Sequence, residues 1–96
     1  SIEKTPVVNG FIVLEQDEYL DNNGWFHISG KVKNIEKQEN SSVRILVEYF
    51  NKQNQTIGKT IYYFDEDFPV NEIKDYDVFK IDNIDGLDTY KFTILR

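Results

Sequence analysis

The stretch of sequence that decides the fold is Ser42–Phe64, SVRILVEYFNKQNQTIGKTIYYF. Its two halves, Val43–Phe50 and Thr56–Phe64, are rich in β-branched and aromatic residues, which favour strands. The polar segment between them, Asn51–Gln55, has the composition of a turn. The sequence therefore predicts a β-hairpin at this place, with the other strands of the chain packed beside it or across from it.

The composition predicts an all-β protein. Of the 96 residues, 40% are hydrophobic and 15% are aromatic, which suffices for one modest core and argues against disorder. Alanine and methionine are absent, whereas isoleucine, valine, threonine, tyrosine and phenylalanine are frequent. We expect residues 1–6 to form a linker or a frayed terminus, and residues 7–96 to form a single β-sandwich domain.

Charge and cysteine content narrow the function classes. The net charge of −6 repels a phosphate backbone, so we expect no nucleic-acid partner. Without cysteine the chain can form neither a disulfide nor a thiolate metal site. No apolar run approaches the ~20 residues that span a bilayer, so we expect no direct membrane insertion of this domain.

A turn signal precedes the clearest strand. Asn23-Gly24 predicts a type I′ hairpin turn, and Trp25–Asn34 follows as a strand. Alternate residues of that strand form an apolar set that should face the core: Phe26, Ile28, Gly30 and Val32. Gly30 predicts a bulge or a close approach by another element. His27 falls on the opposite face, where we expect it to point into solvent.

The later strands are less clearly patterned. Both faces of Thr56–Phe64 are apolar, and we expect Ile57, Ile61 and Tyr63 to point inward. The acidic, proline-containing segment 65–75 should cross from one sheet to the other. The strand Tyr76–Asp82 should place Phe79 and Ile81 inward, and the last strand, 89–96, should bury Tyr90, Phe92 and Ile94. Strands and turns at this spacing favour a β-sandwich of six to seven strands.

Four short segments carry a resemblance to a known family: Gly30-Lys31-Val32-Lys33-Asn34, Val47-Glu48-Tyr49-Phe50-Asn51, Pro69-Val70-Asn71-Glu72 and Phe79-Lys80-Ile81. They correspond in order to a G-x-V-x-N strand end, an F-x-L-Y-D strand end, a P-G-E turn and an F-x-V strand. Asn54 stands where the family has a turn glycine. Over residues 24–94 the chain thus resembles the FxLYD domain family of prokaryotic envelope proteins.

The resemblance implies an immunoglobulin-like β-sandwich of mostly antiparallel strands. It implies an extracytoplasmic place, in a secreted or membrane-anchored protein whose signal segment lies outside this sequence. The family's motifs specify strands and turns, so the resemblance carries over no catalytic residues and no cofactor.

Two groups of polar residues are candidates for a site. His27 and Ser29 lie two residues apart on one strand face, ~6–7 Å by the strand rise, which is too far for direct proton transfer. Acidic turns could supply oxygen ligands for Ca²⁺, although their spacing is not that of an EF-hand. These turns contain Asp65, Glu66 and Asp67, and Asp82, Asp85 and Asp88.

Exposed aromatic and apolar residues form the third candidate. Trp25 and nearby tyrosines could stack on sugar rings or anchor a protein partner. The residues chosen as a candidate partner surface are Trp25, Leu46, Phe50, Tyr62 and Phe64.

From these observations we expect a non-catalytic module that acts as an interaction or spacer domain of a larger extracytoplasmic protein. Its partner would be another protein or a component of the cell envelope, and it would need neither a cofactor nor a metal. The alternatives are a carbohydrate-binding domain that uses exposed aromatic residues and an adhesion module stabilised by Ca²⁺.

Overall fold

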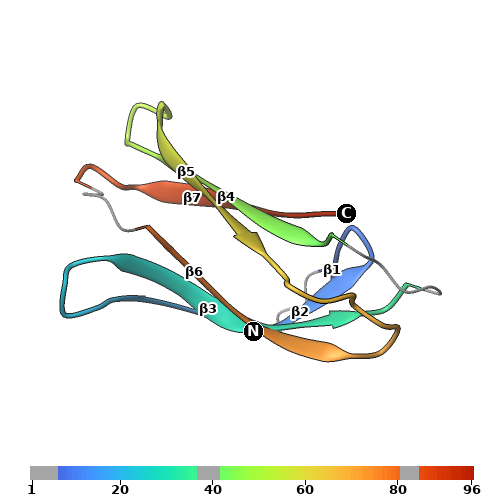
Figure 1. Ribbon diagram of the computed structural model, residues 1–96. Helices are drawn as coiled ribbons and strands as arrows, with labels where there is room; N and C mark the ends of the chain where they lie inside the picture. Colours follow the sequence, from blue (N-terminus) through green and yellow to red (C-terminus); the bar gives the residue numbers. More distant parts are fainter. Residues whose placement is uncertain (1–6, 37–41, 81–84) are drawn as a thin grey trace, which may run out of the picture.

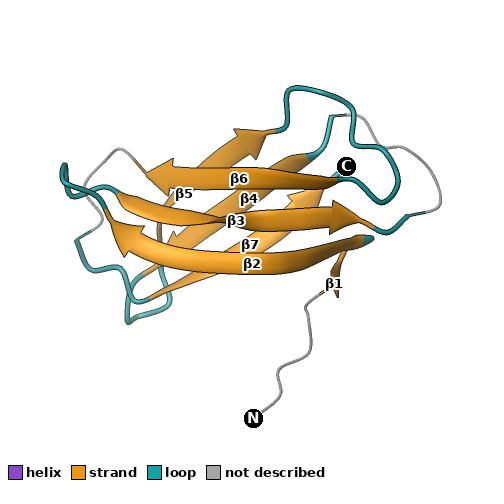
Figure 2. Ribbon diagram, turned by 90° about the horizontal axis from the view of Figure 1, so that it is seen from below, coloured by secondary structure: helices purple, strands orange, loops and turns teal. Residues whose placement is uncertain are grey.

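The computed structural model describes residues 7–36, 42–80 and 85–96. In these residues seven strands form two antiparallel sheets, in the orders β1-β2-β3-β6 and β5-β4-β7. The strands are β1 (Val7–Val8), β2 (Phe11–Leu20), β3 (Phe26–Asn34), β4 (Arg44–Phe50), β5 (Thr56–Tyr63), β6 (Ile73–Lys80) and β7 (Thr89–Leu95). The two sheets lie one over the other, as Figures 1 and 2 show. The predicted all-β sandwich is confirmed.

The linker expected at residues 1–6 lies outside the described residues. The part of the chain that the structure describes holds no helix long and apolar enough to cross a membrane.

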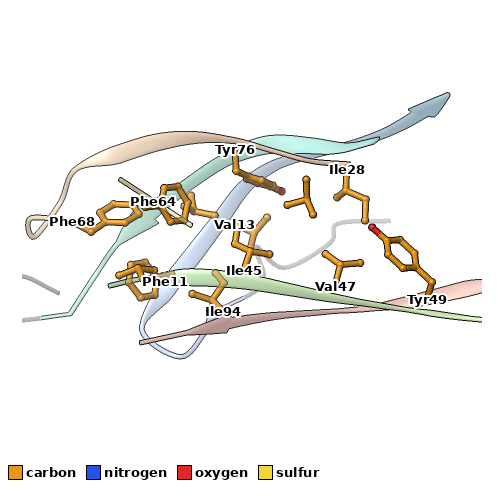
Figure 3. Packing of buried hydrophobic residues seen from close by; sticks show 13 residues of the cluster. Phe11, Val13, Ile28, Ile45, Val47, Tyr49, Phe64, Phe68, Tyr76 and Ile94 are labelled. Atoms are coloured by element: carbon orange, nitrogen blue, oxygen red, sulfur yellow. The ribbon is translucent and has the colours of Figure 1, made fainter. Parts of the chain in front are cut away.

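The core fills the space between the two sheets (Figure 3). The sheet of β2, β3 and β6 contributes Ile28 and Val32, and β4 contributes every second residue of its length, from Ile45 to Tyr49. This period of two is what a strand with one buried face requires. The predicted inward residues Phe26, Ile28 and Val32, and those of the last strand, Tyr90, Phe92 and Ile94, are confirmed as members of the core or packed against it.

The hairpin turn between Asp21 and Trp25 is not of the predicted type. Asn23 lacks a positive φ, and only Gly24 has one, at 79°. The turn has three central residues and is closed by the hydrogen bond from Asp21 N to Trp25 O, 3.0 Å. This geometry is a type I turn followed by a left-handed residue, so the type I′ prediction was wrong there.

The Asn-Gly pair with two positive φ values lies earlier in the chain. Asn9 and Gly10 have φ of 50° and 87°, and they join Val8 directly to its partner Phe11. The second hairpin, at Asn51–Gln55, repeats the three-residue turn, with Asn54 at φ 62° in the glycine position. Asparagine tolerates this left-handed conformation better than most residues.

Two strands present the face opposite to the one predicted. On β5, Ile61 and Tyr63 are exposed, whereas Gly58 and Thr60 point inward. The reason lies on β4: the fully buried ring of Tyr49 lies opposite Gly58, and its hydroxyl donates to Thr60 Oγ1 at 3.3 Å. Small side chains at these inward positions leave room for that ring. Ile57, also expected inward, is exposed at the bulge of β5.

On β6 the inward residues are Tyr76 and Val78, so the prediction for Phe79 was wrong, and Ile81 lies outside the described residues. β6 begins at Ile73, and its register sets Val78 opposite the core residue Ile28. Because residues directly opposite share a face, Phe79 must point outward with its partner, His27.

The segment 64–72 crosses from β5 to β6, as the sequence predicted, and closes one end of the core. Phe68 is fully buried in it, with its ring 5.1 Å from that of Phe11. Asn34, at the end of β3, is also fully buried and donates from Nδ2 to the Phe68 carbonyl at 2.8 Å. This asparagine therefore ties the crossing segment to the first sheet.

Candidate functional site

The outer side of the sheet β5-β4-β7 carries apolar residues where a solvated sheet would be polar. On β4 the core residues alternate with Leu46 and Phe50, which point away from the core. Register places Leu46 opposite Ile61, so both lie on the same outer side. We call this surface the outer apolar face, and its apolar residues are Leu46, Phe50, Ile57, Ile61 and Tyr63.

Three apolar residues of this face, all on β5, are exposed to solvent. Ile57 is 38% exposed, Ile61 41% and Tyr63 60%. Full burial of such side chains stabilises a protein by about 1.5–3 kcal/mol each. A slip of one residue would turn the outward side chains of β5 inward, yet the strand holds Gly58 and Thr60 there. The most apolar side of β5 is thus kept in solvent.

The charges on this face are mostly positive, in a protein of net charge −6. Lys59 and Lys91 lie opposite Glu48 on either side of it, and Arg44 lies opposite Tyr63. Within the described residues, the Nε of Arg44 is buried without a hydrogen-bond partner. A buried unpaired donor carries a cost of about 1–3 kcal/mol.

The residues chosen from the sequence as a partner surface are distributed over three places. Leu46 and Phe50 belong to the outer apolar face. Tyr62 and Phe64 point inward: Tyr62 packs against the core, and Phe64 is 8% exposed within it. Trp25 lies on the other sheet, where its ring stacks on Phe79 with centroids 6.0 Å apart. The hairpin was thus located correctly, but the face of its second strand was not.

The outer side of the sheet β1-β2-β3-β6 carries a row of parallel rings. Tyr19 stacks on His27 at 4.6 Å, His27 on Phe79 at 5.0 Å, and Phe79 on Trp25. Neighbouring strands supply the first three rings at directly paired positions. Since the inner rings have both faces covered by other rings, only the outward faces of Tyr19 and Trp25 remain for stacking with a ligand.

His27 at the centre of this row is held by two carboxylates. Its Nε2 lies 2.7 Å from Asp21 Oδ2, and its Nδ1 lies 2.8 Å from Asp77 Oδ1. The residue is 8% exposed, so the expectation of a solvent-facing histidine was wrong. The cause is tertiary: the turn before β3 brings Asp21 to one side, and β6 brings Asp77 to the other. Both ring nitrogens are occupied, so neither is placed to take a proton from Ser29.

The electrostatics of this cluster favour the charged imidazolium. Burial lowers the pKa of His27, but the hydrogen bonds to Asp21 and Asp77 outweigh burial, and the pKa lies above its ordinary 6.5. The pKa of Asp21 lies below its ordinary 3.8, chiefly because of the hydrogen bond to His27. Asp21 Oδ1 also accepts from the backbone N–H groups of Asn23 and Trp25, at 2.8 and 3.0 Å. The histidine was visible in the sequence, but its two partners were not.

The acidic turns considered for Ca²⁺ lie apart from one another. Asp65, Glu66 and Asp67 are exposed in the crossing segment, and Asp85 and Asp88 are exposed before β7. Asp82 lies outside the described residues. In residues 7–36, 42–80 and 85–96, no group of three acidic or histidine side chains is arranged to hold a metal ion.

Comparison with known proteins gives no relative from which to assign the site: no family model, no curated protein and no solved structure matches the chain.

Proposed function

We propose that this protein is a non-catalytic interaction module of a larger extracytoplasmic protein, and that it binds a protein partner through the outer apolar face. The observation that carries the proposal is the orientation of β5. Its isoleucines and Tyr63 point into solvent while Gly58 and Thr60 face the core. Adjoining exposed apolar residues rimmed by polar residues are typical of a surface that a partner covers.

The extracytoplasmic place rests on the resemblance to the FxLYD family. The turn that resembles P-G-E supports it locally: Glu72 N donates to Pro69 O at 3.2 Å, and Asn71 has φ 68°. A positive φ at this position is what a glycine of that turn would supply. In the proposed setting the domain is secreted or anchored to a membrane by another part of the parent protein.

The alternatives from the sequence receive less support. A sugar ring needs an open aromatic face, and in the row of rings only Tyr19 and Trp25, at its two ends, keep one. A Ca²⁺ site needs converging oxygens, and the described acidic side chains do not converge.

The first test asks whether the outer apolar face serves folding. Threonine preserves β-branching, so we expect Ile61→Thr to change the free energy of unfolding by less than about 0.5 kcal/mol. Ile45→Thr, on the neighbouring strand and fully buried, is the matched control, with an expected loss above roughly 2 kcal/mol. Equal losses in the two variants would show that the face is scaffold and would overturn the proposal.

The second test looks for the partner directly. A photo-crosslinking amino acid replaces Ile61 in the intact parent protein, in the cells that make it, and Gln53 in an exposed turn serves as the control position. We expect a defined adduct at position 61 that is absent at position 53. Failure to obtain an adduct, or the same adducts at both positions, would contradict the proposed function.

A further inference from the structure

The two outer faces of the sandwich differ in charge. The outer apolar face carries Arg44, Lys59 and Lys91 against the single carboxylate Glu48. On the opposite side of the molecule, register gathers acidic residues on the outer side of the other sheet. Glu15 and Asp75 lie on either side of Lys31, and Asp17 and Asp77 lie on either side of Ser29. We call this second surface the acidic face.

The acidic face also exposes apolar side chains. Ile73 is 50% exposed, Tyr19 46% and Phe79 39%, and all three lie at outward positions of β2 and β6. These exposures resemble those of Ile61 and Tyr63 on the outer apolar face.

The acidic face also carries Lys31 and Lys33, and two of its carboxylates are ion-paired: Asp75 with Lys31 at 2.6 Å and Asp77 with His27 at 2.8 Å. Carboxylates are still in excess on this face, whereas cations are in excess on the outer apolar face, so each face offers apolar area and an excess of the opposite charge.

This complementarity selects one arrangement of copies. Two outer apolar faces placed against each other would bring Arg44, Lys59 and Lys91 of both copies together, and like charges across an interface oppose association. An outer apolar face placed on the acidic face of a second copy pairs opposite charges.

We propose that the partner of the outer apolar face is a second copy of this chain, docked through its acidic face. This inference rests on the proposed function and names the occupant of the same surface. The two faces lie on opposite sides of the sandwich, so the contact is head to tail and leaves one free face of each kind at the ends (Figure 1). Such a contact generates open rows of domains, unlike a two-fold contact, which closes at the dimer.

The test uses one charge reversal on each face. Lys59→Glu alters the outer apolar face, and Asp75→Lys alters the acidic face at a carboxylate that is 77% exposed. Each variant alone lacks one half of the contact and should stay monomeric in sedimentation velocity, whereas the unchanged protein should sediment faster as its concentration rises. A mixture of the two variants retains one intact pair of faces, and we expect a one-to-one dimer.

The association should weaken at high salt, because charges on exposed faces are screened. Ile61→Glu serves as a second variant of the outer apolar face should Lys59→Glu lose its fold, which circular dichroism reports. We expect salt to weaken the self-association of the unchanged protein and the mixed dimer to the same degree.

Three outcomes would overturn the inference. The unchanged protein could stay monomeric up to millimolar concentration. Asp75→Lys could leave self-association intact while Lys59→Glu abolishes it, which would indicate a symmetric contact. The mixture could fail to form a dimer. If a crosslink at position 61 then joins the module to a different protein, the proposed function stands and only the identity of the partner is wrong.

Discussion

Gly30 on β3 lies directly against the backbone carbonyl of Glu15 on β2: a Cβ built on residue 30 would stand 1.8 Å from that oxygen. The approach arises at the β-bulge between Val13 and Glu15, where β2 gains one residue relative to β3. Tyr76, opposite Gly30 on β6, reaches across it and places its hydroxyl 3.1 Å from the same carbonyl. The close approach predicted from a glycine within a strand is thus confirmed.

Gly30→Ala should therefore destabilise the protein strongly. The methyl group meets backbone, which cannot move aside as the end of a flexible side chain can, so we expect a loss of about 3 kcal/mol or more in the free energy of unfolding. Chemical denaturation measures it. Ser29→Ala, on the same strand and facing outward, is the control, and a loss no larger in Gly30→Ala than in the control would contradict the role of the bulge.

The His27 cluster predicts a stability that depends on pH at both ends of the range. The pKa of His27 is raised on folding, so its contribution is complete below about pH 6.5 and is lost as the pH rises through the folded-state pKa. The pKa of Asp21 is lowered, so its contribution is present above about pH 3.8 and is lost as the pH falls through the folded-state pKa. We expect the melting temperature to fall on both sides, and His27→Gln to flatten the fall on the alkaline side.

Asp21→Asn separates the two roles of Asp21, which accepts hydrogen bonds in the turn and pairs with His27. In the second hairpin an asparagine already makes the equivalent turn contacts: Asn51 Oδ1 accepts from the N–H groups of Gln53 and Gln55 at 3.0 and 2.9 Å. The turn should therefore persist, while the loss of the carboxylate lowers the pKa of His27 toward its ordinary value. NMR titration of the imidazole checks this. An unchanged His27 pKa would show that Asp77 alone holds the charge.

Asn34→Ala should loosen the closed end of the core. The fully buried amide donates to the Phe68 carbonyl, and its Oδ1 accepts from Glu36 N at 2.8 Å. Removing it leaves buried backbone groups without these partners, at a cost of about 1–3 kcal/mol in the free energy of unfolding. Hydrogen exchange should show the loosening in segment 64–72 before the rest of the core. Uniform exchange along the chain would contradict a local role for Asn34.

Clear alternation made some elements predictable. On β3, apolar and polar residues alternate, so the sequence placed Ile28 and Val32 inward without reference to any other strand. On β5 both sides are apolar, so no local pattern could distinguish them. Its register was decided by Tyr49, which needs the small side chains of β5 beside its ring.

For the same reason, the sequence identified only some residues of the outer apolar face. Leu46 and Phe50 were recognised because their neighbours on β4 clearly face the core. The sequence predicts Ile61 and Tyr63 in the core and Tyr62 and Phe64 on the surface, the reverse of what the structure shows.

The sequence by itself determined that the chain is all-β, that Ser42–Phe64 is a hairpin and that Gly30 marks a close approach. Each of these depends on local chemistry: propensity, turn residues or a missing side chain. Only the tertiary structure decided which side of β5 meets solvent and that two carboxylates enclose His27. Those outcomes depend on residues of other strands, such as Tyr49 and Asp77, which no local pattern joins to their partners.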